Sequence, residues 1–129
     1  MVAVLVNKNN ERYYSGLEGE RTAYLEMKKQ GFTFVRHRYK TSHGEIDLIM
    51  ENTAQSILVF VEVKRRKKIY DYHTVISSRQ WKRIRDAADA FLTEKYDKYK
   101  NYSIRYDAFI CFTDSSTVHH IENIFPPSS

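Results

Sequence analysis

The chain has 129 residues, which suits one folded domain with a hydrophobic core and is too short for two. Its 21 Lys and Arg residues exceed the 16 Asp and Glu residues, for a formal net charge of +5, and this balance favours a polyanionic partner. The single cysteine, Cys111, excludes an internal disulfide and a cysteine-based zinc site, and it fits a reducing compartment.

No apolar run approaches the length that is needed to cross a membrane. The apolar opening, residues 1–6, is too short for a signal-peptide core and leads into polar residues. We therefore expect a cytoplasmic protein with no membrane partner. One domain is expected over residues 1–129, with a core from about 16 to 125 and short flexible tails at both ends.

The first predicted element is a helix over residues 16–30. Residues 15–18 have the form of a capping box, and Gly31 is typical of the position after a helix end. Helical spacing places the carboxylate of Glu20 on the inward apolar stripe, which consists of Leu17, Ala23, Tyr24 and Met27. Such a carboxylate either serves a site or bonds a nearby Tyr or Arg.

Three strands are predicted next, over residues 32–38, 44–50 and 57–64. A turn at residues 53–56 would make the last two a hairpin, since its length suits one. The register that follows pairs Asn52 with Ile57, Met50 with Val59, Asp47 with Glu62 and Glu45 with Lys64. Opposed residues share a face, so this register brings two carboxylates together with an ion pair beside them.

A second helix is predicted from Ser77 or Ser78 to about residue 95, and its apolar stripe consists of Trp81, Ile84, Ala88, Phe91 and Leu92. Residues 94–101 are rich in tyrosine and charge and are assigned only as a frayed helix end or a loop. A buried strand over 104–112, a turn at 113–116 and another strand over 118–124 complete the chain. This order predicts an α/β protein with a mixed sheet and helices packed on it.

The paired carboxylates predict a site for a hard cation, Mg²⁺ or Mn²⁺. Mg²⁺ takes oxygen ligands and is usually held by one or two carboxylates plus waters and phosphate, and here Asp47 and Glu62 would provide them. Glu20 could add a ligand. Lys64 could stabilise the negative charge that develops during phosphodiester hydrolysis. The alternative is an ordinary cross-strand ion pair on a solvated sheet face.

Positive charge gathers after the proposed active strand and at the start of the second helix. Contact with DNA phosphates is predicted for Arg65, Arg66, Lys67, Lys68, Arg79, Gln80, Lys82 and Arg83. The alternative is a solvated loop and a solvated helix surface. The five histidines show no spacing that fits a metal site, and we assign them no role; adjacent His119 and His120 would point to opposite faces of a strand.

The motifs resemble the YraN-like family of small bacterial proteins, within the restriction-endonuclease-like PD-(D/E)xK superfamily, and are similar to archaeal Holliday junction resolvases. The resemblance runs from about Gly16 to Phe125. It is carried by Gly19-Glu20, Ala23, Tyr24-Leu25, Gly31-Phe32, Gly44 to Ile49, Val59 to Lys64, Arg66 and, more loosely, Arg105 to Asp107. The chain departs from the family pattern at residues 70–74 and at Gln80.

The resemblance implies a restriction-endonuclease-like α-β-β-β-α-β core. It implies a Mg²⁺ site at Asp47 and Glu62 that the backbone carbonyl of Val63 completes, with Lys64 as the catalytic lysine and Glu20 as a helix-borne acidic residue. The expected activity is endonucleolytic cleavage of DNA, with branched or single-stranded DNA as candidate substrates. Resolvase-like enzymes act as dimers, and the strand near residues 118–124 could pair two copies. The alternative is a nucleic-acid-binding or adaptor protein on the same fold with little catalysis.

Overall fold

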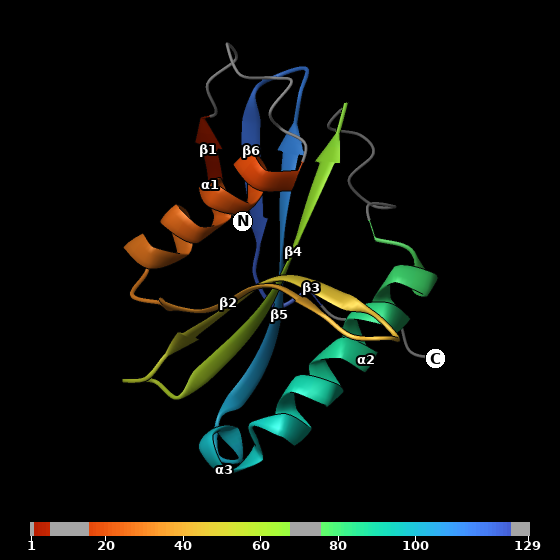
Figure 1. Ribbon diagram of the computed structural model, residues 1–129. Coiled ribbons are helices and arrows are strands. Elements are labelled where there is room, and N and C mark those ends of the chain that lie inside the picture. Colours follow the sequence, from red (N-terminus) through yellow and green to blue (C-terminus); the bar gives the residue numbers. More distant parts are fainter. Residues whose placement is uncertain (1, 6–15, 68–75, 125–129) are drawn as a thin grey trace.

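The computed structural model describes residues 2–5, 16–67 and 76–124 (Figure 1). The elements are β1 (Val2–Leu5), α1 (Gly16–Lys29), β2 (Thr33–Lys40), β3 (Glu45–Asn52), β4 (Ile57–Arg66), α2 (Ser78–Glu94), α3 (Tyr96–Tyr99), β5 (Ser103–Phe112) and β6 (Thr117–Ile121). Each helix and strand predicted from the sequence is present, with ends shifted by a few residues. The first residue of the predicted capping box, Ser15, lies outside the described residues.

The strands form one six-stranded sheet in the order β1-β6-β5-β4-β3-β2. Strands β4 and β5 are parallel and the other neighbours are antiparallel, which confirms the predicted mixed sheet. Residues 2–5, which we expected in a flexible tail, instead form β1 and pair with β6. The tail prediction was wrong there because a four-residue apolar run is too short to show a strand pattern. Strand β6 is therefore an inner strand, with β1 on the side where a second copy was expected to pair.

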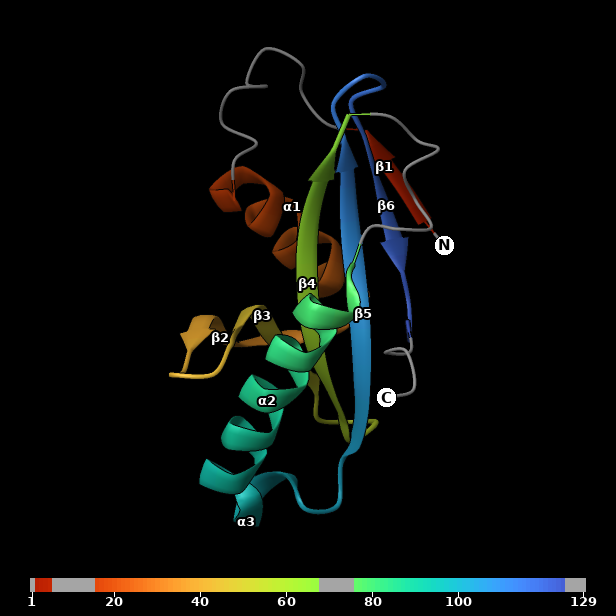
Figure 2. The ribbon, with the colours of Figure 1, turned by 90° about the vertical axis from the view of Figure 1, so that its right-hand side faces the viewer.

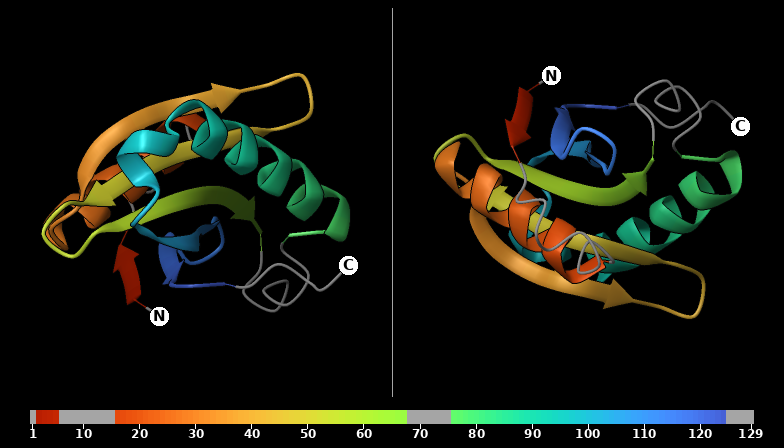
Figure 3. Two further views of the ribbon diagram at one scale, coloured as in Figure 1. Left: turned by 90° about the horizontal axis from the view of Figure 1, so that it is seen from below. Right: turned by 90° about the horizontal axis from the view of Figure 1, so that it is seen from above.

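The helices pack on the sheet through two separate hydrophobic cores. Alternate residues of β4 enter the two cores: Val59 and Val61 pack with the residues of α1, and Leu58 and Phe60 pack with those of α2. Figure 2 shows α2 running along the sheet, and Figure 3 shows the twist of the strands between the helices. No helix within residues 16–67 or 76–124 is long and apolar enough to cross a membrane.

Local signals set the ends of both long helices. At the end of α1, the Phe32 N–H donates to the Met27 carbonyl at 3.1 Å and the Gly31 N–H donates to the Lys28 carbonyl at 3.1 Å. Gly31 has a φ of 95°, so this is a Schellman motif that a residue with a side chain would strain. At the start of α2, Ser77 Oγ accepts the Gln80 N–H at 3.1 Å. Both predicted helix ends are confirmed.

The predicted hairpin register is confirmed where β3 and β4 are paired. Asn52 lies opposite Ile57 and Met50 lies opposite Val59, across the turn at residues 53–56. The register ends with the pair Leu48 and Val61. The same count predicted that Asp47 lies opposite Glu62, and this part of the prediction was wrong because the two residues are not a ladder pair. Beyond this point β4 continues along β5 to Arg66. The predicted acidic residues thus lie where two neighbouring strands stop pairing.

Candidate functional site

The carboxylate of Asp47 fills a break in the sheet. Ile46 and Leu48, its neighbours on β3, both enter hydrophobic cores, but Ile46 packs with the α2 side and Leu48 with the α1 side. Residues two apart in a regular strand share a face, so the alternation breaks at Asp47. The Val63 N–H donates to Asp47 Oδ2 at 2.8 Å. A side chain therefore satisfies a backbone donor on β4 that the ladder no longer pairs.

Glu62 and Lys64 form a close ion pair beside Asp47. Lys64 Nζ lies 3.0 Å from Glu62 Oε2, and the two side chains are 15% and 11% exposed, respectively. Burial, reinforced by the neighbouring carboxyl of Asp47, raises the pKa of Glu62 to about 8 despite the opposing effect of Lys64. The partner predicted for Lys64 was wrong: Lys64 pairs with Glu62, whereas Glu45 is exposed and lies opposite Lys40 on β2.

Glu20 is buried on the inward face of α1, as its helical phase predicted, with 5% of its surface exposed. Its two carboxylate oxygens accept hydrogen bonds from Arg38, whose Nε lies 3.0 Å from Oε1 and whose Nη2 lies 3.4 Å from Oε2. His37 Nε2 also contacts Oε1. The alternative in which an inward Glu bonds an Arg is therefore confirmed as a contact. Arg38 has a φ of 51°, an unfavourable value for this residue type, and lies on β2 level with the break at Asp47.

These side chains meet in a cavity of about 180 Å³ that four elements enclose. It is lined by Glu20 of α1, Glu45 and Asp47 of β3, Glu62, Val63 and Lys64 of β4, and Gln80, Arg83 and Ile84 of α2. A neighbouring cavity of about 210 Å³ is lined by Glu20, Arg38, Lys40, Glu45, Ile46 and Asp47. The structure thus brings together all four residues predicted to be catalytic, Val63 and two of the predicted phosphate contacts.

The remaining predicted phosphate contacts lie outside this cavity. Arg65, Arg66 and Lys67 follow Lys64 at the end of β4, and Lys68 lies outside the described residues. On α2, Arg79 and Lys82 are exposed, and Lys82 Nζ lies 2.9 Å from Asp86 Oδ2. The cavity therefore lies between two groups of cations, one at the end of β4 and one at the start of α2.

Gly44 holds the β2–β3 loop against α2. A Cβ atom at this position would lie 1.9 Å from the carbonyl oxygen of Arg83, so only glycine permits the approach. Thr41 stabilises the loop, because its Oγ1 accepts the Gly44 N–H at 3.0 Å and its backbone N–H donates to the Gly44 carbonyl at 2.8 Å. The start of β3, which carries Asp47, is therefore fixed next to the helix that supplies Arg83.

The donor set of the cavity fits a hard cation with few protein ligands. Asp47 and Glu62 offer carboxylate oxygens, and a bound cation would offset the burial and the neighbouring carboxyl of Asp47, which together raise the pKa of Glu62. Within the parts of the chain that the structure describes, no three His, Cys, Asp or Glu side chains are grouped so that they could hold a metal ion. Glu20 faces Arg38 and His37, so the fit extends to two carboxylates and not to a third.

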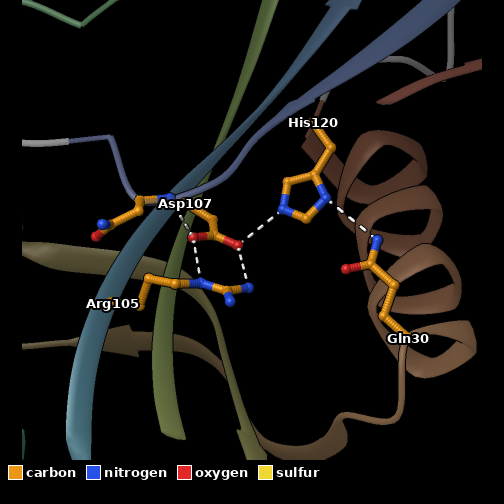
Figure 4. A network of polar contacts seen from close by, with 5 residues as sticks. Gln30, Arg105, Asp107 and His120 are labelled. Atoms are coloured by element: carbon orange, nitrogen blue, oxygen red, sulfur yellow. Dashed lines mark hydrogen bonds and ion pairs between the residues drawn. The ribbon is translucent and has the colours of Figure 1, made fainter. Parts of the chain in front are cut away.

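A buried polar network that the sequence analysis missed joins β5, β6 and the end of α1 (Figure 4). Arg105 donates to both oxygens of Asp107, at 2.9 and 2.8 Å, and the Asn123 N–H donates to Oδ1 at 2.9 Å. His120 Nε2 lies 2.7 Å from Asp107 Oδ2, and its Nδ1 lies 3.3 Å from Gln30 Nε2. The sequence signals were the family resemblance at Arg105 to Asp107 and the shared strand face of these two residues.

The network stabilises the buried negative charge of Asp107 and does not expose it to a ligand. Burial on its own would raise the pKa of Asp107, but the hydrogen bonds from His120, Arg105 and the Asn123 N–H outweigh it and lower the pKa. Asp107 and His120 are 1% and 0% exposed, and neither lines the cavity at Asp47. The contacts therefore fasten β6 to β5 and to the residues that follow α1. The two histidines were predicted to point to opposite faces of the strand, and their rings contact different side chains: His120 stacks on Phe109, whereas His119 meets Phe112 edge to face.

Residues 19–111 match the family model described as Uncharacterised protein family UPF0102. A UPF0102 protein of Bartonella bacilliformis is 34% identical over 113 residues, which cover 88% of this chain and 89% of the relative. A UPF0102 protein of Rhodopseudomonas palustris strain BisB18 is 32% identical over 116 residues, covering 90% and 83%. One from Bradyrhizobium diazoefficiens is 29% identical over 117 residues, covering 91% and 85%. The matched range contains Glu20, Asp47, Glu62 and Lys64.

Proposed function

We propose that this chain is a metal-dependent nuclease that hydrolyses phosphodiester bonds in DNA. The chain belongs to the Uncharacterised protein family UPF0102, which is the YraN-like family expected from its motifs. The observation that carries the proposal is the cavity in which Asp47, Glu62 and Lys64 lie side by side, with the lysine 3.0 Å from a buried carboxylate. The order of elements agrees with a PD-(D/E)xK endonuclease core, to which we assign the chain.

Each residue of the cavity has a role that its chemistry supports. Asp47, Glu62 and the Val63 carbonyl would hold Mg²⁺ or Mn²⁺, which when bound would polarise the phosphodiester. Lys64, which Glu62 orients through the 3.0 Å ion pair, would stabilise the negative charge that develops on the phosphate. Glu20 would position the side chains of Arg38 and His37, because both contact its carboxylate.

The substrate assignment rests on charge. Arg83 and Gln80 reach the cavity from α2, where they could contact the phosphate next to the cut bond. The cations at residues 65–68 and at Arg79 and Lys82 would contact phosphates further along the strand. Branched or single-stranded DNA is the proposed substrate form, by analogy with resolvases.

A second candidate is a nucleic-acid-binding protein without catalysis. The observation that favours it is the state of Glu20, whose oxygens bond Arg38 and His37, together with the lack of a three-ligand cluster in the described parts of the chain. In that case the acidic cavity would not support catalysis, and the cationic residues at the end of β4 and the start of α2 would still bind nucleic-acid phosphates.

A cleavage assay separates the two candidates. Labelled duplex, single-stranded and four-way-junction DNA would be incubated with Mg²⁺, with Mn²⁺ or with EDTA. We expect cation-dependent cleavage by the wild type, and a loss of about 10²-fold or more in Asp47→Asn and Lys64→Ala. The matched control is Asp97→Asn, an exposed acidic residue of α3 that should cleave as the wild type does. Binding without cleavage by the wild type would favour the second candidate, and equal cleavage by all variants would reject the site.

A further inference from the structure

A larger and more apolar cavity, of about 600 Å³, lies between α1 and β2. It is lined by Glu18, Glu20, Arg21, Tyr24, Phe34, His37 and Leu48. The rings of Tyr24 and Phe34 meet edge to face, with centroids 6.1 Å apart, and Phe34 is 52% exposed. A large exposed aromatic side chain beside an apolar hollow is typical of binding sites, so this cavity is a candidate for a flat, apolar ligand.

The apolar cavity adjoins the acidic one. Glu20 lines the apolar cavity, the cavity with Asp47 and Glu62, and the third cavity with Arg38 and Lys40. A ligand in the apolar cavity would therefore lie on the other side of Glu20 from the carboxylates proposed to hold the metal. One extended ligand could occupy both cavities at once.

The surroundings of the apolar cavity favour an anionic ligand. Strand β2 is an edge of the sheet and carries exposed cations at Arg36, Arg38 and Lys40, with exposed Arg21 on α1. Glu18 and Glu20 oppose them, but Arg38 and His37 already contact Glu20. A second copy of this chain is disfavoured, because it would bring two edges with the same positive charge together.

We propose that the cavity between α1 and β2 binds an unpaired nucleobase of the DNA strand whose phosphate lies in the acidic cavity. The proposal rests on the proposed nuclease function and deepens it, because it names the substrate class as DNA with unpaired nucleotides beside the cut. A base in a duplex is stacked and paired, so it cannot enter the cavity, whereas an unpaired base can stack on Phe34 while neighbouring phosphates contact the cations of β2.

The test measures binding in EDTA, so it does not depend on cleavage. Fluorescence anisotropy would give the Kd of a labelled 12-nucleotide single strand, of the same strand with abasic sites at its centre, and of a duplex. The variants are Phe34→Ala, Phe34→Trp and Tyr96→Ala, since Tyr96 is an exposed aromatic residue on α3, 62% exposed. Phe34 is surface-exposed, so its replacement should leave the fold intact.

We expect Phe34→Ala to weaken binding of the normal strand about fivefold or more, with no change for the abasic strand, and Phe34→Trp to restore it. Tyr96→Ala should bind as the wild type does. Equal loss with both strands, or no loss, would overturn the proposal. So would a self-association that Phe34→Ala abolishes while DNA binding stays unchanged. If the wild type cleaves DNA and Phe34→Ala cleaves and binds it equally well, the base site alone would be rejected. If the wild type binds none of the DNA substrates, the proposed function would be rejected as well.

Discussion

Asp47 Oδ2 accepts the backbone N–H of Val63 at 2.8 Å, so a side chain joins β3 to β4 where their ladder has ended. The contact fixes the carboxylate of Asp47 against the residue between Glu62 and Lys64. It therefore makes the geometry of the acidic cavity part of the sheet's own hydrogen bonding. The first prediction follows from this double role.

Replacing Asp47 should separate its structural role from its charge. In Asp47→Asn the amide oxygen can still accept the Val63 N–H and the repulsion on Glu62 is gone, so stability at pH 7.5 should equal or exceed that of the wild type. In Asp47→Ala the donor loses its acceptor, which should cost about 1–3 kcal/mol relative to Asp47→Asn. Urea unfolding in EDTA measures both, and equal stability of the two variants would contradict the contact.

The pKa of Glu62 predicts how stability depends on pH without a divalent cation. The folded state holds a proton on Glu62 up to about pH 8, whereas the unfolded chain releases it near its ordinary value of 4.5. Between these values the folded state binds more protons, so stability should fall as pH rises from about 4.5 to 8. Glu62→Gln should flatten this part of the curve in thermal unfolding at successive pH values. A slope identical to that of the wild type would refute the burial of this group.

Titration with Mn²⁺ should distinguish ligands from neighbours. We expect Asp47→Ala and Glu62→Ala to lose the Mn²⁺ affinity of the wild type, because each removes one of two carboxylate ligands. Glu20→Gln should keep most of the affinity, since Glu20 bonds Arg38 and His37. Calorimetry at a fixed pH measures the affinities, with Asp97→Asn as the control. A loss in Glu20→Gln as large as in Glu62→Ala would make Glu20 a third ligand.

Adding a methyl group at Gly44 should disturb the site from outside it. In Gly44→Ala the new Cβ would meet the Arg83 carbonyl oxygen at 1.9 Å, so the β2–β3 loop or α2 must move. We expect a loss of about 1–3 kcal/mol in the free energy of unfolding and weaker Mn²⁺ binding, because the start of β3 moves with the loop. Ser42→Ala, an exposed change in the same loop, is the matched control. Unchanged unfolding of Gly44→Ala would show that the close contact is absent.

The parts of the fold that depend on neighbouring residues could be predicted. Gly31 ends α1 through two local hydrogen bonds, and Ser77 begins α2 through one. The turn at residues 53–56 fixed the register of β3 and β4 as far as Leu48 and Val61. The phase of Glu20 followed from helical geometry, and its burial confirms it. Each of these features is determined within a few residues along the chain.

The sequence by itself determined the order of the elements from α1 to β6 apart from α3, and it singled out Glu20, Asp47, Glu62 and Lys64 of the acidic cavity, because periodicity, caps and turns are local. Only the tertiary structure decided that the ladder ends before Asp47, that Lys64 pairs with Glu62 rather than Glu45, and that His120 reaches Asp107. These contacts depend on how β4 turns from β3 to β5 and how Gly44 packs on α2. Such packing joins residues far apart in the chain, so no local pattern records it.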